Sequence, residues 1–150
     1  MNGWILAATV ELGGGGAAAL WGVTTGPTGR RVIAQNLATS VVCPALLLLS
    51  QGYGRPAYVD LALLLAVLGP VGTLVFARLL SDDLAGERPS AWGLTWAAAA
   101  LGAVVVVACC VATGPSRAMA KLLVIGALLI GGNVIASRAL SGGFQGVRGG

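Results

Sequence analysis

Charge is scarce in this sequence. Only 9% of its 150 residues are charged, nine Lys or Arg and five Asp or Glu, while 57% are hydrophobic. A soluble domain needs roughly 25% charged residues to cover its surface, so a water-facing shell is excluded. A lipid bilayer removes that need, because lipid solvates apolar side chains. The net charge of +4 is dispersed, with no basic run longer than Arg30-Arg31, which argues against nucleic-acid binding and fits loops beside a membrane.

Histidine is absent altogether. Its absence excludes His-based acid–base catalysis and His-ligated metal sites. The three cysteines, Cys43, Cys109 and Cys110, lie inside apolar blocks, where we expect them to be small packing residues. No nucleophile–base pair, phosphate-binding loop or metal-ligand spacing occurs. We therefore expect neither an enzyme nor a cofactor or metal site.

Five apolar blocks are each long enough to cross a bilayer, which takes about 20 helical residues. Short segments rich in Gly, Pro and charge separate them, as helix stop signals do. Because short connections join antiparallel neighbours, the predicted fold is an all-α integral membrane protein of about five antiparallel transmembrane helices. No Lys or Arg precedes Arg30, so the first block lacks the basic start of a signal peptide, and we expect it to be retained. The blocks are Trp4–Thr24, Val32–Leu49, Tyr58–Leu79, Ala91–Thr113 and Lys121–Leu140.

The positive charges predict the orientation of these helices. With the N-terminus outside and the C-terminus in the cytoplasm, six Arg residues fall on the cytoplasmic side and three basic residues on the outer side. The positive-inside rule favours this arrangement over its reverse. The cytoplasmic set is Arg30, Arg31, Arg78, Arg88, Arg138 and Arg148, and the outer set is Arg55, Arg117 and Lys121.

Glu11 is the polar residue that most needs an explanation. It lies about one third of the way into the first block, where an ionisable side chain costs a few kcal/mol. Gly13, Gly14, Gly15 and Gly16 follow it. Each glycine weakens a helix by about 1 kcal/mol relative to alanine and lets another backbone approach closely. Two interpretations stay open: a carboxylate that carries a proton or cation, or a protonated or hydrogen-bonded Glu at a subunit contact.

In the second and third blocks, Asp60 and Asn36 are further candidates for an ion route, and Pro70 is a candidate packing position. Asp60 lies in the first turn of the third helix, where the macrodipole favours a carboxylate, so a structural role competes with ion handling. Asn36 begins the second helix, where hydrogen bonding between helices is the default role. Pro70 frees the carbonyl of Ala66, either to meet an ion or simply to kink the helix for packing.

Close helix packing is predicted at two further places. Gly72 follows Pro70 in a Gly-Pro-Val-Gly-Thr segment. Asn133 and Ser137 are spaced i, i+4 and share one face of the fifth helix. Two glycines directly before Asn133 make a close helix–helix contact the plain interpretation.

The third block carries a set of short motifs. They are Asp60-Leu61-Ala62, then Gly72-Thr73, then Phe76-Ala77-Arg78, preceded upstream by Gly26-Pro27-Thr28 and by Arg31-Val32-Ile33-Ala34. In these motifs the sequence resembles the F subunit of Mrp-type multisubunit cation/proton antiporters. The resemblance covers about residues 1–80 and implies three helices with the N-terminus outside. It matches Asp60, Thr73 and Arg78 to family positions.

Two positions depart from the family's pattern. Where the family has Asp-Arg and a further Asp five residues after that Arg, this sequence has Arg30-Arg31 and Asn36. An Asn side chain carries neither a proton nor the charge that holds a cation. The last block, ending Asn133-Val-Ile-Ala-Ser-Arg-Ala-Leu, resembles the last helix of the G subunit of the same complexes, although the His of that pattern is missing. The predicted organisation is an F-like module (1–80), a cytoplasmic linker (81–90), a G-like hairpin (91–140) and a flexible tail (141–150).

The resemblance implies an accessory subunit of an Mrp-related Na⁺/proton antiporter complex in the inner membrane of a prokaryotic cell. Its partners would be other membrane subunits and the bilayer, and Na⁺ or H⁺ the ion. Glu11, Asp60, Thr73 and Asn36 are then the candidates for the ion path. Three alternatives stay open: a subunit of a redox-driven complex such as a membrane-bound hydrogenase or a complex I-like assembly, a stand-alone proton-coupled exporter, and a passive scaffold.

Overall fold

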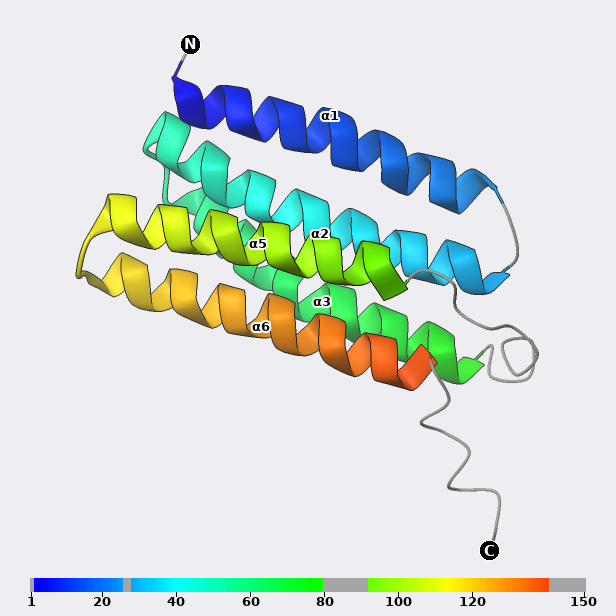
Figure 1. Cartoon of the computed structure of the whole chain (residues 1–150). Coiled ribbons are helices and arrows are strands. Elements are labelled where there is room, and N and C mark those ends of the chain that lie inside the picture. The colour runs from blue at the N-terminus through cyan, green and yellow to red at the C-terminus, as the bar shows by residue number, and fades with distance from the viewer. Residues whose placement is uncertain (1, 26–27, 80–91, 141–150) are drawn as a thin grey trace, which may run out of the picture.

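The computed structural model describes residues 2–25, 28–79 and 92–140. Within these ranges the chain is entirely helical, without strands (Figure 1). All five helices are long and apolar enough to cross a membrane, which confirms the predicted all-α fold with five spans. The predicted linker (81–90) and tail (141–150) lie outside the described residues. The helices are α1 (Gly3–Thr24), α2 (Thr28–Tyr53), α3 (Ala57–Leu79), α5 (Trp92–Thr113) and α6 (Arg117–Leu140).

Two helices extend beyond their predicted apolar blocks. α2 begins at Thr28 and continues to Tyr53, four residues past the predicted limit on each side, and α6 begins at Arg117 instead of Lys121. Basic and polar side chains at a helix end reach the aqueous surface along their own stems. The helical backbone therefore continues past the point where the sequence stops being apolar.

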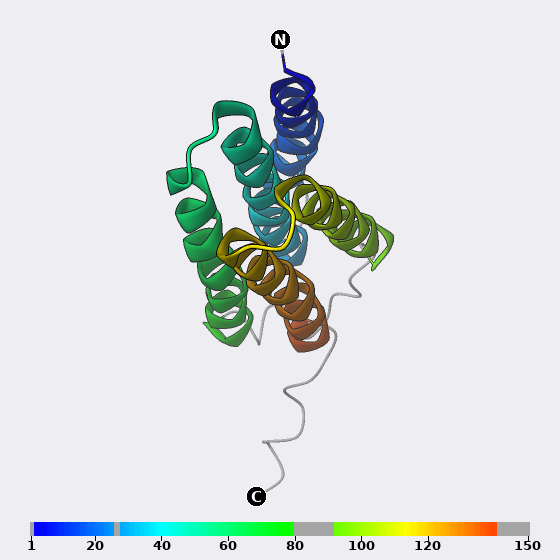
Figure 2. The same ribbon diagram turned by 90° about the vertical axis from the view of Figure 1, so that its left-hand side faces the viewer.

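The helices alternate in direction along the chain and pack around α2 (Figures 1 and 2). α2 packs against α1, α3 and α5, and α6 packs against α3 and α5. The expectation that all consecutive helices are neighbours is wrong for α3 and α5, because α2 and α6 lie between them. α6 instead lies parallel to α3, and α5 lies parallel to α2.

On α1 and α3, small side chains face the interior of the bundle, and many large apolar side chains face outward. On α1 the buried positions are Ala8, Ala19 and Gly22, which share one helical face. This pattern is expected in a bilayer, where lipid is as apolar as leucine and close helix packing, rather than burial of large side chains, holds helices together. Large apolar residues that are at least half exposed on α1 and α3 include Leu6, Val10, Leu20, Trp21, Leu64 and Leu68.

Two glycines allow close contacts between helices. A Cβ atom at Gly15 would lie 2.6 Å from both γ-methyl carbons of Val41, so α1 meets α2 here almost backbone to side chain. A Cβ at Gly132 would collide with the ring of Pro70. Pro70 therefore lies in the α3–α6 contact, where its ring fills the space that Gly132 leaves.

The two ends of the bundle are distinguished by their turns. We call the end where α1 begins, which also carries the α2–α3 and α5–α6 turns, the N-terminal end, and the opposite one the C-terminal end (Figure 1). Gly54 and Gly114, in the two turns at the N-terminal end, have φ of +63° and +67°, a left-handed conformation that costs glycine little. Gln51 Nε2 donates to the Thr113 hydroxyl at 2.8 Å and ties α2 to α5 at this end.

Candidate functional site

A buried group of polar side chains joins α2, α3 and α6. Asn36 Nδ2 donates to Asn133 Oδ1 at 2.6 Å, and the Thr73 hydroxyl donates to Asn36 Oδ1 at 3.4 Å. We call these three residues the amide cluster. All three are buried: Asn36 is 9% exposed, Asn133 5% and Thr73 4%. Asn36 thus bonds to two other helices at once.

Nearby backbone carbonyls add further hydrogen bonds around the amide cluster. The Ser40 hydroxyl donates to the carbonyl of Asn36 at 3.0 Å, and the Thr73 hydroxyl is also 3.0 Å from the carbonyl of Gly69. Every side chain in the cluster is neutral. Its chemistry is therefore hydrogen bonding between helices, which contributes roughly 0.6 kcal/mol per bond on average in membrane proteins. An ion role for Asn36 and Thr73 stays a prediction.

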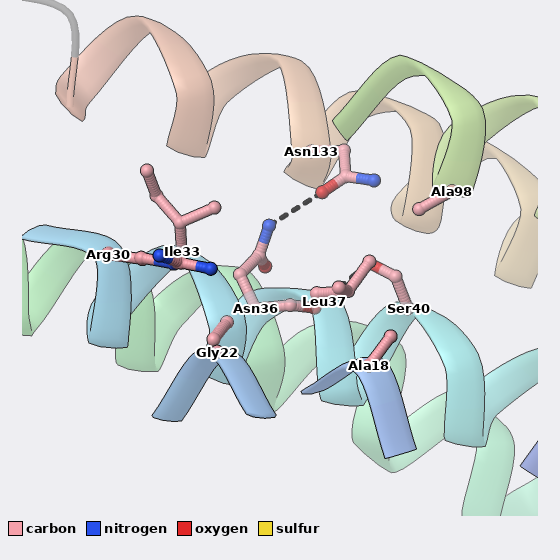
Figure 3. A pocket seen from close by; sticks show the side chains of 10 residues that line it. Ala18, Gly22, Arg30, Ile33, Asn36, Leu37, Ser40, Ala98 and Asn133 are labelled. Carbon is pink, nitrogen blue, oxygen red and sulfur yellow. Dashed lines mark hydrogen bonds between the residues drawn. The ribbon is translucent and has the colours of Figure 1, made fainter. Parts of the chain in front are cut away.

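A cleft of about 80 Å³ opens beside the amide cluster, between residues of α1, α2, α5 and α6 (Figure 3). Asn36, Ser40 and Asn133 form its polar side, and small residues such as Ala18, Gly22 and Ala98 form its apolar walls. Arg30, at the start of the α2 span, lines its outer part. The sequence did not indicate this cleft, because its lining comes from four helices.

Glu11 lies on the inner face of α1, in register with Ala8 and Gly15. Both of its carboxylate oxygens are shielded from solvent, and no hydrogen-bond partner for them is found among the described residues. Because both oxygens are shielded, the carboxylate is directed into the bundle.

Glu11 and the amide cluster are separate features. Gly15 meets Val41 and Gly22 meets Ala34, so the antiparallel register places Glu11 near residue 45 of α2. At 1.5 Å per residue, this level is about 13 Å along α2 from Asn36. The structure does not bring the predicted carboxylate and the predicted amide together into one site.

Asp60 occupies a third place, at the N-terminal end of the bundle. Its carboxylate accepts a hydrogen bond from Lys121 Nζ at 3.0 Å, and the two side chains are 60% and 56% exposed. Lys121 belongs to α6, so the ion pair links α3 to α6 at the surface. Exposed pairs of this kind contribute about 0–1 kcal/mol. The sequence predicted the helix N-terminal position of Asp60 but not its basic partner, and an ion-path role for Asp60 stays a prediction.

Several predicted packing glycines have no close neighbour among the described residues. Added Cβ atoms at Gly13, Gly14, Gly16 and Gly72 would meet nothing within 4 Å among the described residues. The Ser137 hydroxyl donates to a carbonyl of its own helix at 3.0 Å. Contacts of these residues with a neighbouring subunit stay predictions.

The three cysteines are free thiols, and Cys43 and Cys109 are buried in the core. The Cys43 thiol donates to the carbonyl of Ala62 across the α2–α3 contact, with Sγ 3.1 Å from the oxygen. Within 2–25, 28–79 and 92–140, no group of three or more Cys, Asp or Glu side chains is placed to hold a metal ion.

Five apolar helices that enclose a neutral amide cluster and one unpartnered carboxylate define a multi-pass helical membrane protein. Residues 30–81 match the family model of the Multiple resistance and pH regulation protein F (MrpF / PhaF). The match spans nearly all of α2 and α3, about a third of the chain, and confirms the resemblance expected for that segment. It includes Asn36, Asp60 and Thr73 but not Glu11. Searches of curated proteins and of solved structures gave no significant match.

Proposed function

We propose that this chain is an accessory subunit of an Mrp-related multisubunit cation/proton antiporter complex. The observation that carries the proposal is the family match over residues 30–81, which covers the central helix α2 and its neighbour α3. The proposal includes Na⁺ as the exchanged cation and the inner membrane of a prokaryotic cell as the location. It also includes an F-like module of α1 to α3 joined to a G-like hairpin of α5 and α6.

The distribution of basic residues supports an orientation with the N-terminus outside. Among the described residues, four Arg side chains belong to the C-terminal end of the bundle and three basic side chains to the N-terminal end. By the positive-inside rule the C-terminal end faces the cytoplasm. The four are Arg30, Arg31, Arg78 and Arg138, and the three are Arg55, Arg117 and Lys121.

Glu11 is the residue that we propose takes part in ion movement. An ionised carboxylate without a hydrogen-bond partner is costly to bury, and the described residues offer its oxygens none. Glu11 is therefore stabilised by a proton, by a cation, or by a group from a partner subunit. The amide cluster cannot replace it, because Asn36, Thr73 and Asn133 carry no charge.

Asp60 is proposed to have a structural role instead. Its carboxylate is already paired with Lys121 at the exposed end of the bundle. With one inner carboxylate among its described residues, Glu11, the chain provides only part of an ion route. We propose that partner subunits complete the route and that the amide cluster holds α2, α3 and α6 in position beside it.

The test is replacement of Glu11 by Gln in the chain co-expressed with its large antiporter subunits. Gln keeps the shape of the side chain and removes its charge and its titration. We expect co-purification of the complex to be unchanged and Na⁺/H⁺ exchange, followed with a pH-sensitive dye in everted vesicles, to be largely lost. Asp60→Asn is the matched control, also a carboxylate-to-amide change, and should keep most of the exchange activity.

Other outcomes point to the competing functions. Full activity of both Glu11→Gln and Asp60→Asn would identify a passive scaffold. Exchange by the purified chain alone would identify a stand-alone exporter. Co-purification with iron–sulfur or [NiFe] proteins would identify a redox-driven complex.

A further inference from the structure

The cleft beside the amide cluster has a charged mouth and apolar walls. Arg30 lines it from the first turn of α2, at the C-terminal end of the bundle, where the basic side chain of a transmembrane helix reaches towards the aqueous surface. Ala18, Gly22, Leu37 and Ala98 contribute apolar surface farther in. No carboxylate of the described residues pairs with Arg30. Arg30 therefore gives this part of the cleft a positive charge that no carboxylate among the described residues neutralises.

The inner part of the cleft offers a hydrogen-bond donor. Asn133 is only 5% exposed, and its Oδ1 accepts the hydrogen bond from Asn36 Nδ2. None of the described residues accepts a hydrogen bond from its Nδ2 atom, and Asn133 lines the cleft (Figure 3). A molecule in the cleft would thus meet a cation at the mouth and an amide N–H at the floor, both suited to anionic or ester oxygens.

The position of the cleft limits what can enter it. It lies between α1 and α5, which are not packed neighbours, so it is reached from the side of the bundle. A cation is disfavoured by Arg30. A phosphodiester with a linear acyl chain has the right charge and location.

We propose that this cleft binds one anionic phospholipid, with the phosphate at Arg30 and the first part of an acyl chain between α1 and α5. The bound lipid closes the gap between these helices and fills the space beside the amide cluster. This role goes beyond ion exchange, and it can fail or succeed independently of the Glu11 proposal.

Native mass spectrometry of the purified full-length chain tests the proposal, with phosphatidylglycerol and phosphatidylcholine of identical acyl chains as probes. We expect the chain to retain phosphatidylglycerol in preference to phosphatidylcholine. Arg30→Gln should reduce retained phosphatidylglycerol roughly fivefold, which corresponds to the ~1 kcal/mol that one basic residue contributes near an anionic surface. Arg78→Gln is the matched control, since Arg78 is also exposed at the C-terminal end of the bundle but does not line the cleft.

A second variant tests the apolar part of the cleft without changing any charge. Ala98→Leu places three more carbon atoms in the free volume and should reduce retention of both lipids. Phosphatidylglycerol carrying a diazirine in its acyl chain should cross-link to the cleft-lining residues of α1, α2 and α5 in the wild type, and less in Ala98→Leu. Equal lipid retention by wild type, Arg30→Gln and Ala98→Leu, or cross-links spread evenly over all five helices, would overturn the proposal. So would cross-linking in the intact complex that marks only a partner subunit.

Discussion

Replacing Asn133 by Ala should destabilise the bundle through the loss of one hydrogen bond. The bond from Asn36 Nδ2 to Asn133 Oδ1 is 2.6 Å long and fully inside the protein. Its removal leaves the Asn36 amide nitrogen without an acceptor among α2, α3 and α6. A buried polar group left unsatisfied costs about 1–3 kcal/mol, whereas interhelical hydrogen bonds measured in membrane proteins average about 0.6 and reach about 1.7 kcal/mol.

The expected loss for Asn133→Ala is therefore about 1–2 kcal/mol, near the upper end of the membrane range because the bond is short and buried. Asn36→Ala should cost somewhat more, since Asn36 also accepts from Thr73 at 3.4 Å. Thr73 keeps its bond to the Gly69 carbonyl, which limits that additional cost.

A double-mutant cycle measures the bond itself. Unfolding of wild type, Asn36→Ala, Asn133→Ala and the double variant is followed by circular dichroism in mixed micelles of increasing dodecyl sulfate content. We expect a coupling free energy of about 1 kcal/mol, so the double variant should be at most about 1 kcal/mol less stable than Asn36→Ala. Strictly additive losses would show that the two amides do not bond and would refute the arrangement of α2 against α6.

Two smaller predictions concern contacts between other helices. Gly15→Ala should lower the unfolding free energy measured in the same micelles, because its new Cβ meets Val41 at 2.6 Å. Gly14→Ala should raise the unfolding free energy by up to about 1 kcal/mol through helix propensity alone. The opposite order of the two variants would contradict the α1–α2 register. Lys121→Ala removes the exposed pair with Asp60 and should lower the unfolding free energy by less than about 1 kcal/mol. This loss of stability should shrink further in high salt. A larger, salt-independent loss would mean that the pair is not exposed.

The spans could be predicted from sequence because the signal for a membrane helix is length and apolarity, which are local properties. The predicted limits of α1 and α3 differ from the observed ones by at most one residue. The predicted limits of α2 fell short on both sides, because Arg30 and Arg31 at its start and Ser50 and Gln51 near its end are polar and yet helical. Which helices pack against each other was harder to predict from the sequence, because apolar residues do not reveal which helix they face. For this reason α3 was wrongly expected beside α5.

The site was predicted as separate residues rather than as an arrangement. Glu11, Asn36 and Asn133 each stood out because a polar group within a span needs a reason, and Thr73 stood out through the family resemblance. The bond between Asn36 and Asn133 joins residues 97 positions apart, and no periodicity relates such distant positions. The cleft at Arg30 was missed for the same reason, because four helices contribute to it.

Purification of the tagged full-length chain from its native membranes, followed by transport assays on what accompanies it, tests the central claim most directly. Membership in an antiporter complex predicts that large antiporter-like membrane subunits co-purify and that the assembly exchanges Na⁺ for H⁺ in proteoliposomes. A chain that purifies alone and transports ions by itself, or an assembly without cation/proton exchange, would contradict the claim.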